Sequence, residues 1–148
     1  MMILIANNLG DTISEKVTKQ FRIIFIGSLI CAYGMLISFA LQGYGLFSIF
    51  FSTLSILLSF TFGGLYYKTT KSLAPTISRK WFLTAIVFNI LSAVGICYLS
   101  YMMATKSYDQ HLYLASVYWY LHFQYNGWFL FAVVGLIINH FETFKYIY

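Results

Sequence analysis

Apolar residues fall into four long runs along this chain, and short polar, basic or glycine-containing segments separate the runs. Each run is long enough to cross a bilayer, because the hydrocarbon core needs roughly 20 residues of α-helix. Four such helices with short connections use nearly all of the 148 residues. The predicted spans lie at about 22–41, 46–67, 81–103 and 117–138.

The composition supports lipid as the medium of these helices. Hydrophobic residues make up 60% of the chain and charged residues only 9%, whereas soluble domains carry about 25% charged residues. A soluble fold of this size could not bury so many apolar side chains and keep a wettable surface. We therefore expect an all-α, integral membrane four-helix bundle, with a lead-in over residues 1–20 and the four-span domain over residues 21–148.

The lead-in carries the pattern of a helix start. Thr12 and Glu15 have the spacing of a capping box, in which each side chain accepts a hydrogen bond from a free backbone N–H. Apolar residues recur at helical spacing from Ile13 to Phe21, which predicts a short interfacial helix that runs into the first span. The glycine-containing turn at residues 42–45 makes the first two spans antiparallel neighbours.

Basic residues predict the orientation of the bundle. One set of loops and span ends carries eight of the nine Lys and Arg residues, and the other side carries Lys106 alone. Positive charge favours the cytoplasmic side, so we expect both termini in the cytoplasm and the protein in the inner (cytoplasmic) membrane. The net charge of +5 shows no basic stripe interleaved with aromatic residues, and we expect no nucleic-acid partner. The eight residues are Lys16, Lys19, Arg22, Lys68, Lys71, Arg79, Lys80 and Lys145.

Small residues form a stripe along each of the first two spans. Such stripes allow close helix packing in lipid, where no hydrophobic drive brings helices together. We predict that the two stripes face each other or another helix; the alternative is that the serines line a polar pathway. The stripe of the second span is Gly45, Ser48, Ser52, Ser55, Ser59 and Gly63, and that of the first span is Gly27, Cys31, Gly34 and Ser38.

A single amide, Asn89, falls near the middle of the third span, with Ser92 three residues later. An unpaired amide in hydrocarbon costs several kcal/mol. We therefore expect Asn89 to face another helix and to form a hydrogen bond across the interface; a role in ligand binding is the alternative.

The head of the fourth span is unusually polar, and His122 is its one ionisable group near neutral pH. At 100° per residue, Tyr118, Tyr125 and Asn126 share the face of His122, whereas Gln124 lies about 160° away, as 3.6 residues per turn requires. Asn126, one turn below, could orient the imidazole, with Tyr118 and Tyr125 as further partners. Three interpretations stay open: an aromatic interfacial belt, a haem or metal ligand, and a proton-relay or substrate site.

Metal binding by this chain alone is not expected. A metal site needs three or four ligands, and the other histidines, His111 and His140, belong to a loop and to the opposite membrane face. The four acidic residues lie outside the predicted hydrocarbon region, and no phosphate-binding or nucleophile motif is present. We predict no cofactor and expect no enzymatic activity for the chain alone; haem or copper would need ligands from a partner chain.

Two stretches carry a resemblance to a known group, Leu41–Ser48 with the serine-rich span after it, and Tyr120–Phe129. They resemble uncharacterised Bacteroidetes-type polytopic membrane proteins that are distantly similar to the haem-copper oxidase subunit I superfamily. The resemblance covers about residues 21–142. In that larger group a histidine-rich helix precedes the matched region, and this sequence has no such helix. The resemblance implies that His122 matches a position facing a haem or copper site, in a truncated or split relative or a remnant.

Three function classes are compatible with these patterns. The first is a non-catalytic membrane subunit, truncated form or remnant of a haem-copper oxidase-like protein. The second is a redox protein that uses His122 with ligands from a partner chain. The third is a small transporter or channel subunit whose serine stripe lines the path. Besides the lipid bilayer, we expect a membrane-protein partner or a homo-oligomer.

Overall fold

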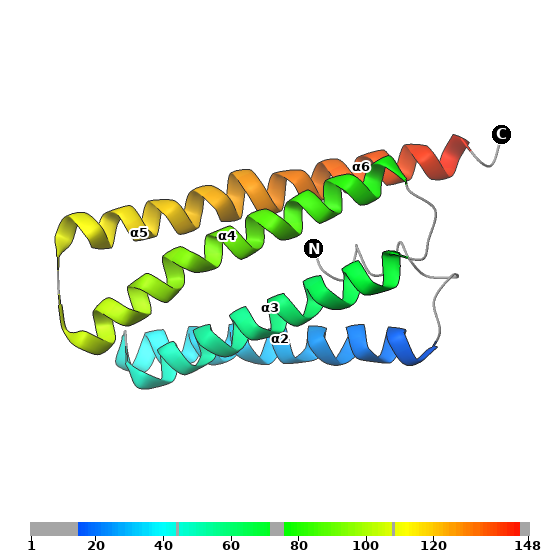
Figure 1. The fold of residues 1–148 in the computed structure, drawn as a ribbon. Helices are drawn as coiled ribbons and strands as arrows, with labels where there is room; N and C mark the ends of the chain where they lie inside the picture. Colours follow the sequence, from blue (N-terminus) through cyan, green and yellow to red (C-terminus); the bar gives the residue numbers. More distant parts are fainter. Residues whose placement is uncertain (1–14, 44, 72–75, 108, 146–148) are drawn as a thin grey trace.

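Four long helices make up the computed structural model, which describes residues 15–43, 45–71, 76–107 and 109–145 (Figure 1). The predicted capping box at Thr12 lies outside the described residues. The first three helices are α2 (Glu15–Gln42), α3 (Leu46–Thr70) and α4 (Ile77–Thr105). The fourth helix has three parts, α5 (Gln110–His122), the π-helical η2 (Phe123–Phe129) and α6 (Leu130–Lys145).

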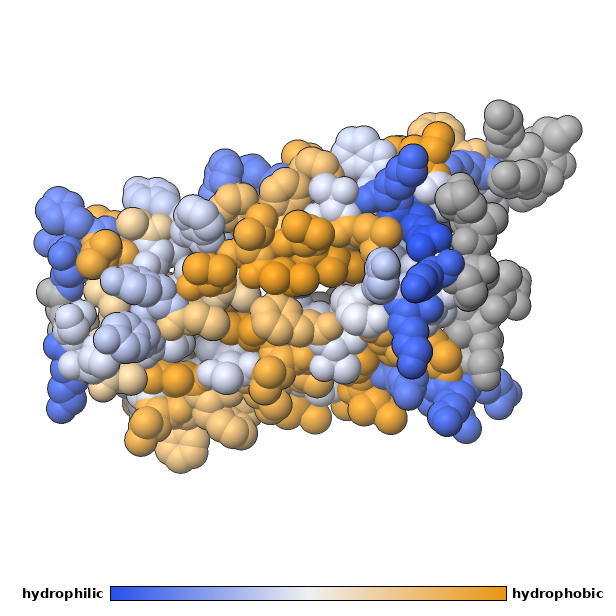
Figure 2. Space-filling view, viewed as in Figure 1, coloured by the Kyte–Doolittle hydropathy of each residue, from blue (hydrophilic) through white to orange (hydrophobic). Residues whose placement is uncertain are grey.

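All four helices are long and apolar enough to cross a membrane. Large apolar side chains are exposed around the bundle; Ile23 and Leu36, for example, are 68% and 65% exposed. Figure 2 shows this apolar surface as a belt between more hydrophilic ends. Lipid is the medium that such a belt fits. The predicted all-α four-helix fold is confirmed, and the chain is a multi-pass membrane protein.

Two helical hairpins form the bundle. In one, α2 packs along α3; in the other, α4 packs along α5, η2 and α6. The hairpins meet through α3 and α4, which pack closely at one end, where Tyr66 contacts Phe82, and are separated by a cavity toward the other. We name the close end the basic end, because Lys68, Lys71, Arg79 and Lys80 lie there, and the other the open end, where Lys106 lies.

An aromatic core holds the two hairpins together at the basic end. The rings of Phe21 and Phe62 pack edge to face at 5.7 Å, and those of Tyr66 and Phe82 at 6.1 Å. These contacts join α2, α3 and α4 in one cluster, which Trp128 and Ala132 of the fourth helix complete. Edge-to-face rings add to the packing that holds helices together in lipid.

Polar side chains of α6 and the loop cover the start of α4. Thr76 accepts a hydrogen bond from the Arg79 backbone N–H, and Glu142 Oε1 accepts one from the Ile77 N–H at 2.9 Å. Ser78 Oγ donates to Asn139 Oδ1 at 3.3 Å. The first N–H groups of a helix lack partners within the helix, and a carboxylate there also offsets the helix dipole. The same bonds fix the end of α6 on α4.

Helix ends explain where the structure departs from the predicted spans. The fourth helix begins at Gln110 rather than near residue 117, because Asp109 caps it by accepting from the N–H groups of His111 and Leu112. At the basic end, α2 is continuous from Glu15, so residues 15–20 form its first turns and run directly into the predicted first span. The predicted turn after the first span contains Gly43, whose φ of 63° is one that glycine adopts without strain.

Candidate functional site

The fourth helix carries its polar residues at the middle of the bundle, not at its outer edge. Trp119 Nε1 donates to the backbone carbonyl of Leu91 at 2.9 Å. Leu91 is the midpoint of α4, fourteen residues from Ile77 and fourteen from Thr105, or roughly 21 Å from each end. From the sequence, Tyr113, Tyr118, Trp119 and Tyr120 were expected at the outer interface; the bond to Leu91 instead sets Trp119 level with the middle of α4.

A π-helical segment follows directly after His122. The Leu130 backbone N–H donates to the carbonyl of Tyr125, five residues earlier, as a π-helix requires. Gly127 lies against the Phe88 ring, and a Cβ at this glycine would lie 2.6 Å from Phe88 Cβ. The wide turn and the glycine together let the fourth helix pass closely over α4. Such segments within α-helices occur frequently at functional sites.

The outward face of this region carries the predicted histidine site. Tyr118 and Tyr125 are 70% and 62% exposed, and His122 and Asn126 are also exposed. Asn126 Nδ2 lies 3.3 Å from His122 Nδ1, so the amide one turn below holds the imidazole as its position suggested. We name these four residues the outward polar face. No other helix of the described bundle covers them.

Metal ligands do not converge on His122. Within the described ranges, no group of three or more His, Cys, Asp or Glu residues could hold a metal ion. His111 lies in the first turn of α5 and His140 in α6, so both are far along the same helix from His122. The described residues therefore bring together no haem-copper or other metal centre.

The inward face of the same region holds a polar cluster that spans three helices. Asn89 of α4 donates from Nδ2 to Ser59 Oγ of α3. Ser92 Oγ donates to Gln124 Oε1 of η2 at 2.9 Å and also lies 2.7 Å from the Asn89 carbonyl oxygen. We name Ser59, Asn89, Ser92 and Gln124 the inward polar cluster. The sequence pattern indicated Asn89 but not Gln124. The angle of about 160° between Gln124 and His122 around the helix already placed Gln124 on the opposite face.

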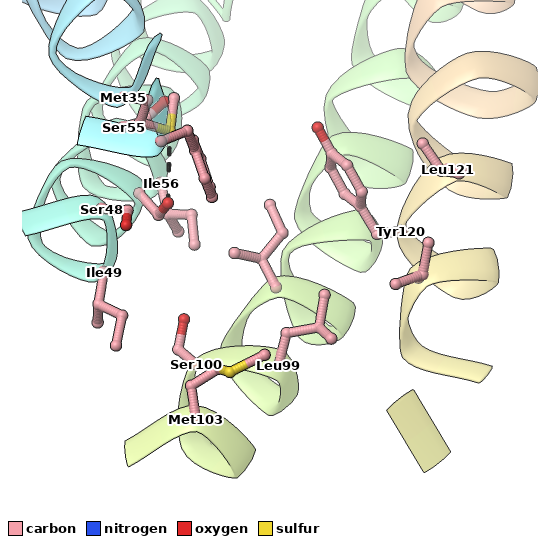
Figure 3. A pocket seen from close by; sticks show the side chains of 14 residues that line it. Met35, Ser48, Ile49, Ser55, Ile56, Leu99, Ser100, Met103, Tyr120 and Leu121 are labelled. Carbon is pink, nitrogen blue, oxygen red and sulfur yellow. Dashed lines mark hydrogen bonds between the residues drawn. The ribbon is translucent and has the colours of Figure 1, made fainter. Parts of the chain in front are cut away.

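Two cavities lie between the hairpins beside this cluster. The smaller, about 150 Å³, is bordered by all four residues of the inward polar cluster and by Trp128. The larger, about 360 Å³, extends toward the open end between α2, α3, α4 and α5, and its lining is mostly apolar. Figure 3 shows side chains of the larger cavity converging from α2 and α3 on one side and from α4 and α5 on the other.

The small residues of α2 accept large side chains from α3. A Cβ at Gly34 would lie 2.6 Å from the Phe51 ring, and one at Gly27 would lie 3.1 Å from Leu58. Cys31 is almost fully buried, and Ser38 is 9% exposed. The small-residue stripe of α2 therefore makes a close contact with α3, but its partners there are a phenylalanine and a leucine rather than the serine stripe.

The serine stripe of α3 turns mainly toward the cleft between the hairpins. Ser48 closes the turn before α3 through hydrogen bonds with Gly43 and Gly45, and Ser52 donates to Met35 Sδ of α2 at 3.3 Å. Ser55 borders both cavities, and Ser59 accepts from Asn89. A Cβ at Gly63 would lie 2.8 Å from Ile86 of α4. The stripe of α2 thus faces Phe51 and Leu58 of α3, whereas Ser59 and Gly63 of α3 face α4.

Comparison of this chain with models of protein families, with curated proteins and with solved structures found no match.

Proposed function

We propose that this chain is a non-catalytic subunit of a larger membrane assembly and that the outward polar face binds another membrane polypeptide. The observation that carries the proposal is the depth of that face. His122 and Asn126 follow Trp119 by three and seven residues, and Trp119 bonds to the midpoint of α4. Two exposed polar side chains of the fourth helix thus lie where the bilayer is most apolar.

Lipid is a poor neighbour for these groups. Within the described bundle, the bond between Asn126 Nδ2 and His122 Nδ1 leaves the amide oxygen, the second imidazole nitrogen and two phenols facing outward. Each polar group without a partner in hydrocarbon costs several kcal/mol. A neighbouring transmembrane helix with polar side chains would satisfy them, and such bonds contribute roughly 0.5–2 kcal/mol each to helix association.

The orientation belongs to the same proposal. The basic end lies in the cytoplasm, because Lys and Arg gather on the cytoplasmic side of membrane proteins, and the membrane is the inner membrane of a bacterium. The resemblance supplies a candidate for the partner, a haem-copper oxidase-like chain that carries the histidine-rich helix absent here. A second copy of this chain is the alternative partner.

Copurification from native membranes tests the proposal. The tagged chain should bring down a defined polypeptide, and a double substitution of His122→Leu with Asn126→Leu should reduce its recovery at least tenfold. The control is Val133→Leu with Ile137→Leu, two exposed apolar positions on the same helix, which should leave recovery unchanged. A partner retained equally by both variants would contradict the proposed interface.

Absorbance spectroscopy of the recovered complex tests the link to haem. If His122 is a ligand in the complex, a Soret band should be present and should shift or disappear in His122→Ala. His111→Ala is the matched control, since His111 lies at the open end. A Soret band identical in the two variants would rule out ligation by His122 and leave the plain subunit role in place.

Transport is a second candidate, favoured by the serines of α3 that border the two cavities. A transport path would pass between the hairpins, and Ser55 borders both cavities. Flux of a solute through liposomes that contain the purified chain should then stop in Ser55→Leu. Flux that is unchanged in this variant would contradict a path along the serine stripe.

A further inference from the structure

The two cavities between the hairpins share one wall. Ser55 and Ile56 of α3, Ile96 of α4 and Tyr120 of α5 border both of them. The cavities therefore form one crevice, with a polar floor at the inward polar cluster and an apolar part toward the open end. In Figure 3 the hydroxyl of Tyr120 points from α5 into the space between the hairpins.

At the polar floor of the crevice, some hydrogen-bond donors and acceptors are not used within the described bundle. Asn89 uses its Nδ2 on Ser59, and Gln124 uses its Oε1 on Ser92. In the part of the chain that the structure describes, no hydrogen bond reaches Asn89 Oδ1, Gln124 Nε2 or the Tyr120 hydroxyl. An acceptor and two kinds of donor thus border one small space, and each such group costs free energy when it stays unpaired in an apolar environment.

The uncharged lining of the crevice and its depth in the membrane determine which class of molecule it can hold. Among the described residues, no Asp, Glu, Lys or Arg side chain borders either cavity, so an ionic headgroup would find no counter-charge there and would have to leave water entirely. Asn89 lies two residues from the midpoint of α4, a depth that headgroups of phospholipids do not reach. Uncharged molecules that dissolve in the bilayer interior do reach it.

From these observations we infer that the crevice binds one molecule of a neutral, hydroxyl-bearing lipid. Its hydroxyl oxygen accepts hydrogen bonds from Gln124 Nε2 and from the Tyr120 hydroxyl, and its hydroxyl hydrogen is donated to Asn89 Oδ1. Its hydrocarbon chain lies in the larger cavity, among side chains such as Ile49, Leu99 and Met103. The volumes of about 360 and about 150 Å³ fall within the range of small-molecule sites. This binding does not depend on the proposed partner interface.

Photolabelling of the full chain in phosphatidylcholine nanodiscs tests the inference on the wild-type protein. The probe is a long-chain primary alcohol with a diazirine in its chain, and mass spectrometry locates the adducts. We expect adducts on the segments that border the larger cavity, 48–56 and 96–103. Excess unlabelled hexadecanol should displace the probe, whereas hexadecane and ionised palmitate should not.

Two amides of the same helix provide the matched variants. Gln124→Leu removes the inward amide and should weaken displacement by hexadecanol about tenfold, while Asn126→Leu removes the outward amide and should leave it unchanged. Tyr120→Phe, which deletes a single oxygen without disturbing the bond between Ser92 and Gln124, should weaken displacement about threefold. Thermal unfolding in the same nanodiscs checks that each variant is folded.

Three results would overturn the inference. Equal competition by hexadecane would make the crevice a plain apolar groove. Adducts spread over the lipid-facing surface of α2 would show no specific site. Labelling of the crevice that no competitor displaces would indicate that only water and passing bilayer lipid enter it.

Discussion

The two ends of the bundle solve the problem of holding helices together in lipid in different ways. At the basic end, aromatic rings from α2, α3 and α4 pack into one core, and α6 covers the start of α4. At the open end each hairpin stays tight within itself, but cavities separate the two hairpins. The contrast indicates that the basic end fixes the fold, whereas the open end and the middle carry the groups available for binding.

Phe82→Ala at the basic end should have the largest effect. The ring is 3% exposed, packs on Tyr66 and fills the space beside Gly135. In soluble cores such a truncation costs about 3–5 kcal/mol; in lipid the transfer contribution is small, so we expect about 2–3 kcal/mol. Thermal unfolding in detergent measures the loss. The control is Leu99→Ala at the open end, which lines a cavity already present and should cost less than about 1 kcal/mol.

Gly95→Ala should come next, with a cost of about 1–3 kcal/mol from overpacking. A Cβ at Gly95 would lie 2.6 Å from the backbone oxygen of Ser116 and 3.0 Å from the backbone nitrogen of Tyr120, so α4 and α5 would have to move apart. Gly64→Ala is the control, since a Cβ there meets nothing within 4 Å. It should be neutral or should stabilise α3 by up to about 1 kcal/mol. Equal stability of the two variants would refute tight packing within the second hairpin.

Glu142→Gln should weaken the basic end by about 0.3–1 kcal/mol, because it removes a carboxylate from the start of α4. The bond from the Ile77 N–H can persist with the amide oxygen, so the loss reflects charge alone. Unfolding measured at low and high salt checks this, and the difference between wild type and variant should shrink at high salt. A difference that does not depend on salt would contradict the electrostatic explanation.

Ser55→Leu should have the smallest effect on stability, within about 0.5 kcal/mol, because the added side chain projects into existing cavity space. Ser78→Leu at the basic end is the contrasting variant, since Ser78 is 2% exposed and donates to Asn139. It should cost about 1–3 kcal/mol. If Ser55→Leu disrupted the fold as strongly, the serine stripe would be a packing surface, as its spacing suggested.

Apolar run lengths sufficed to predict the four helices, because a membrane helix needs a minimum stretch of apolar residues and little else. The start of the fourth helix was missed because aromatic residues from Tyr113 onward looked like an interface, although Asp109 is a good helix cap. The π-helical segment had no sequence signal, since it reflects how Gly127 packs on Phe88 of another helix. A stripe of small residues likewise predicts that another helix approaches closely. It does not predict which side chain of that helix packs against the stripe, as the contact of Phe51 with Gly34 illustrates.

Spin-label accessibility at position 125 tests the central claim most directly, namely that another protein covers the outward polar face at mid-membrane depth. The label is attached to Tyr125→Cys in a chain without Cys31 and Cys97, and Ile30→Cys, an exposed apolar position near the middle of α2, is the reference. In native membranes we predict that oxygen reaches position 125 far less than position 30, and that a water-soluble nickel complex reaches neither. Equal, high oxygen accessibility at both positions would mean that lipid covers the outward polar face, and high nickel accessibility at position 125 would mean that water does; either result would contradict the account.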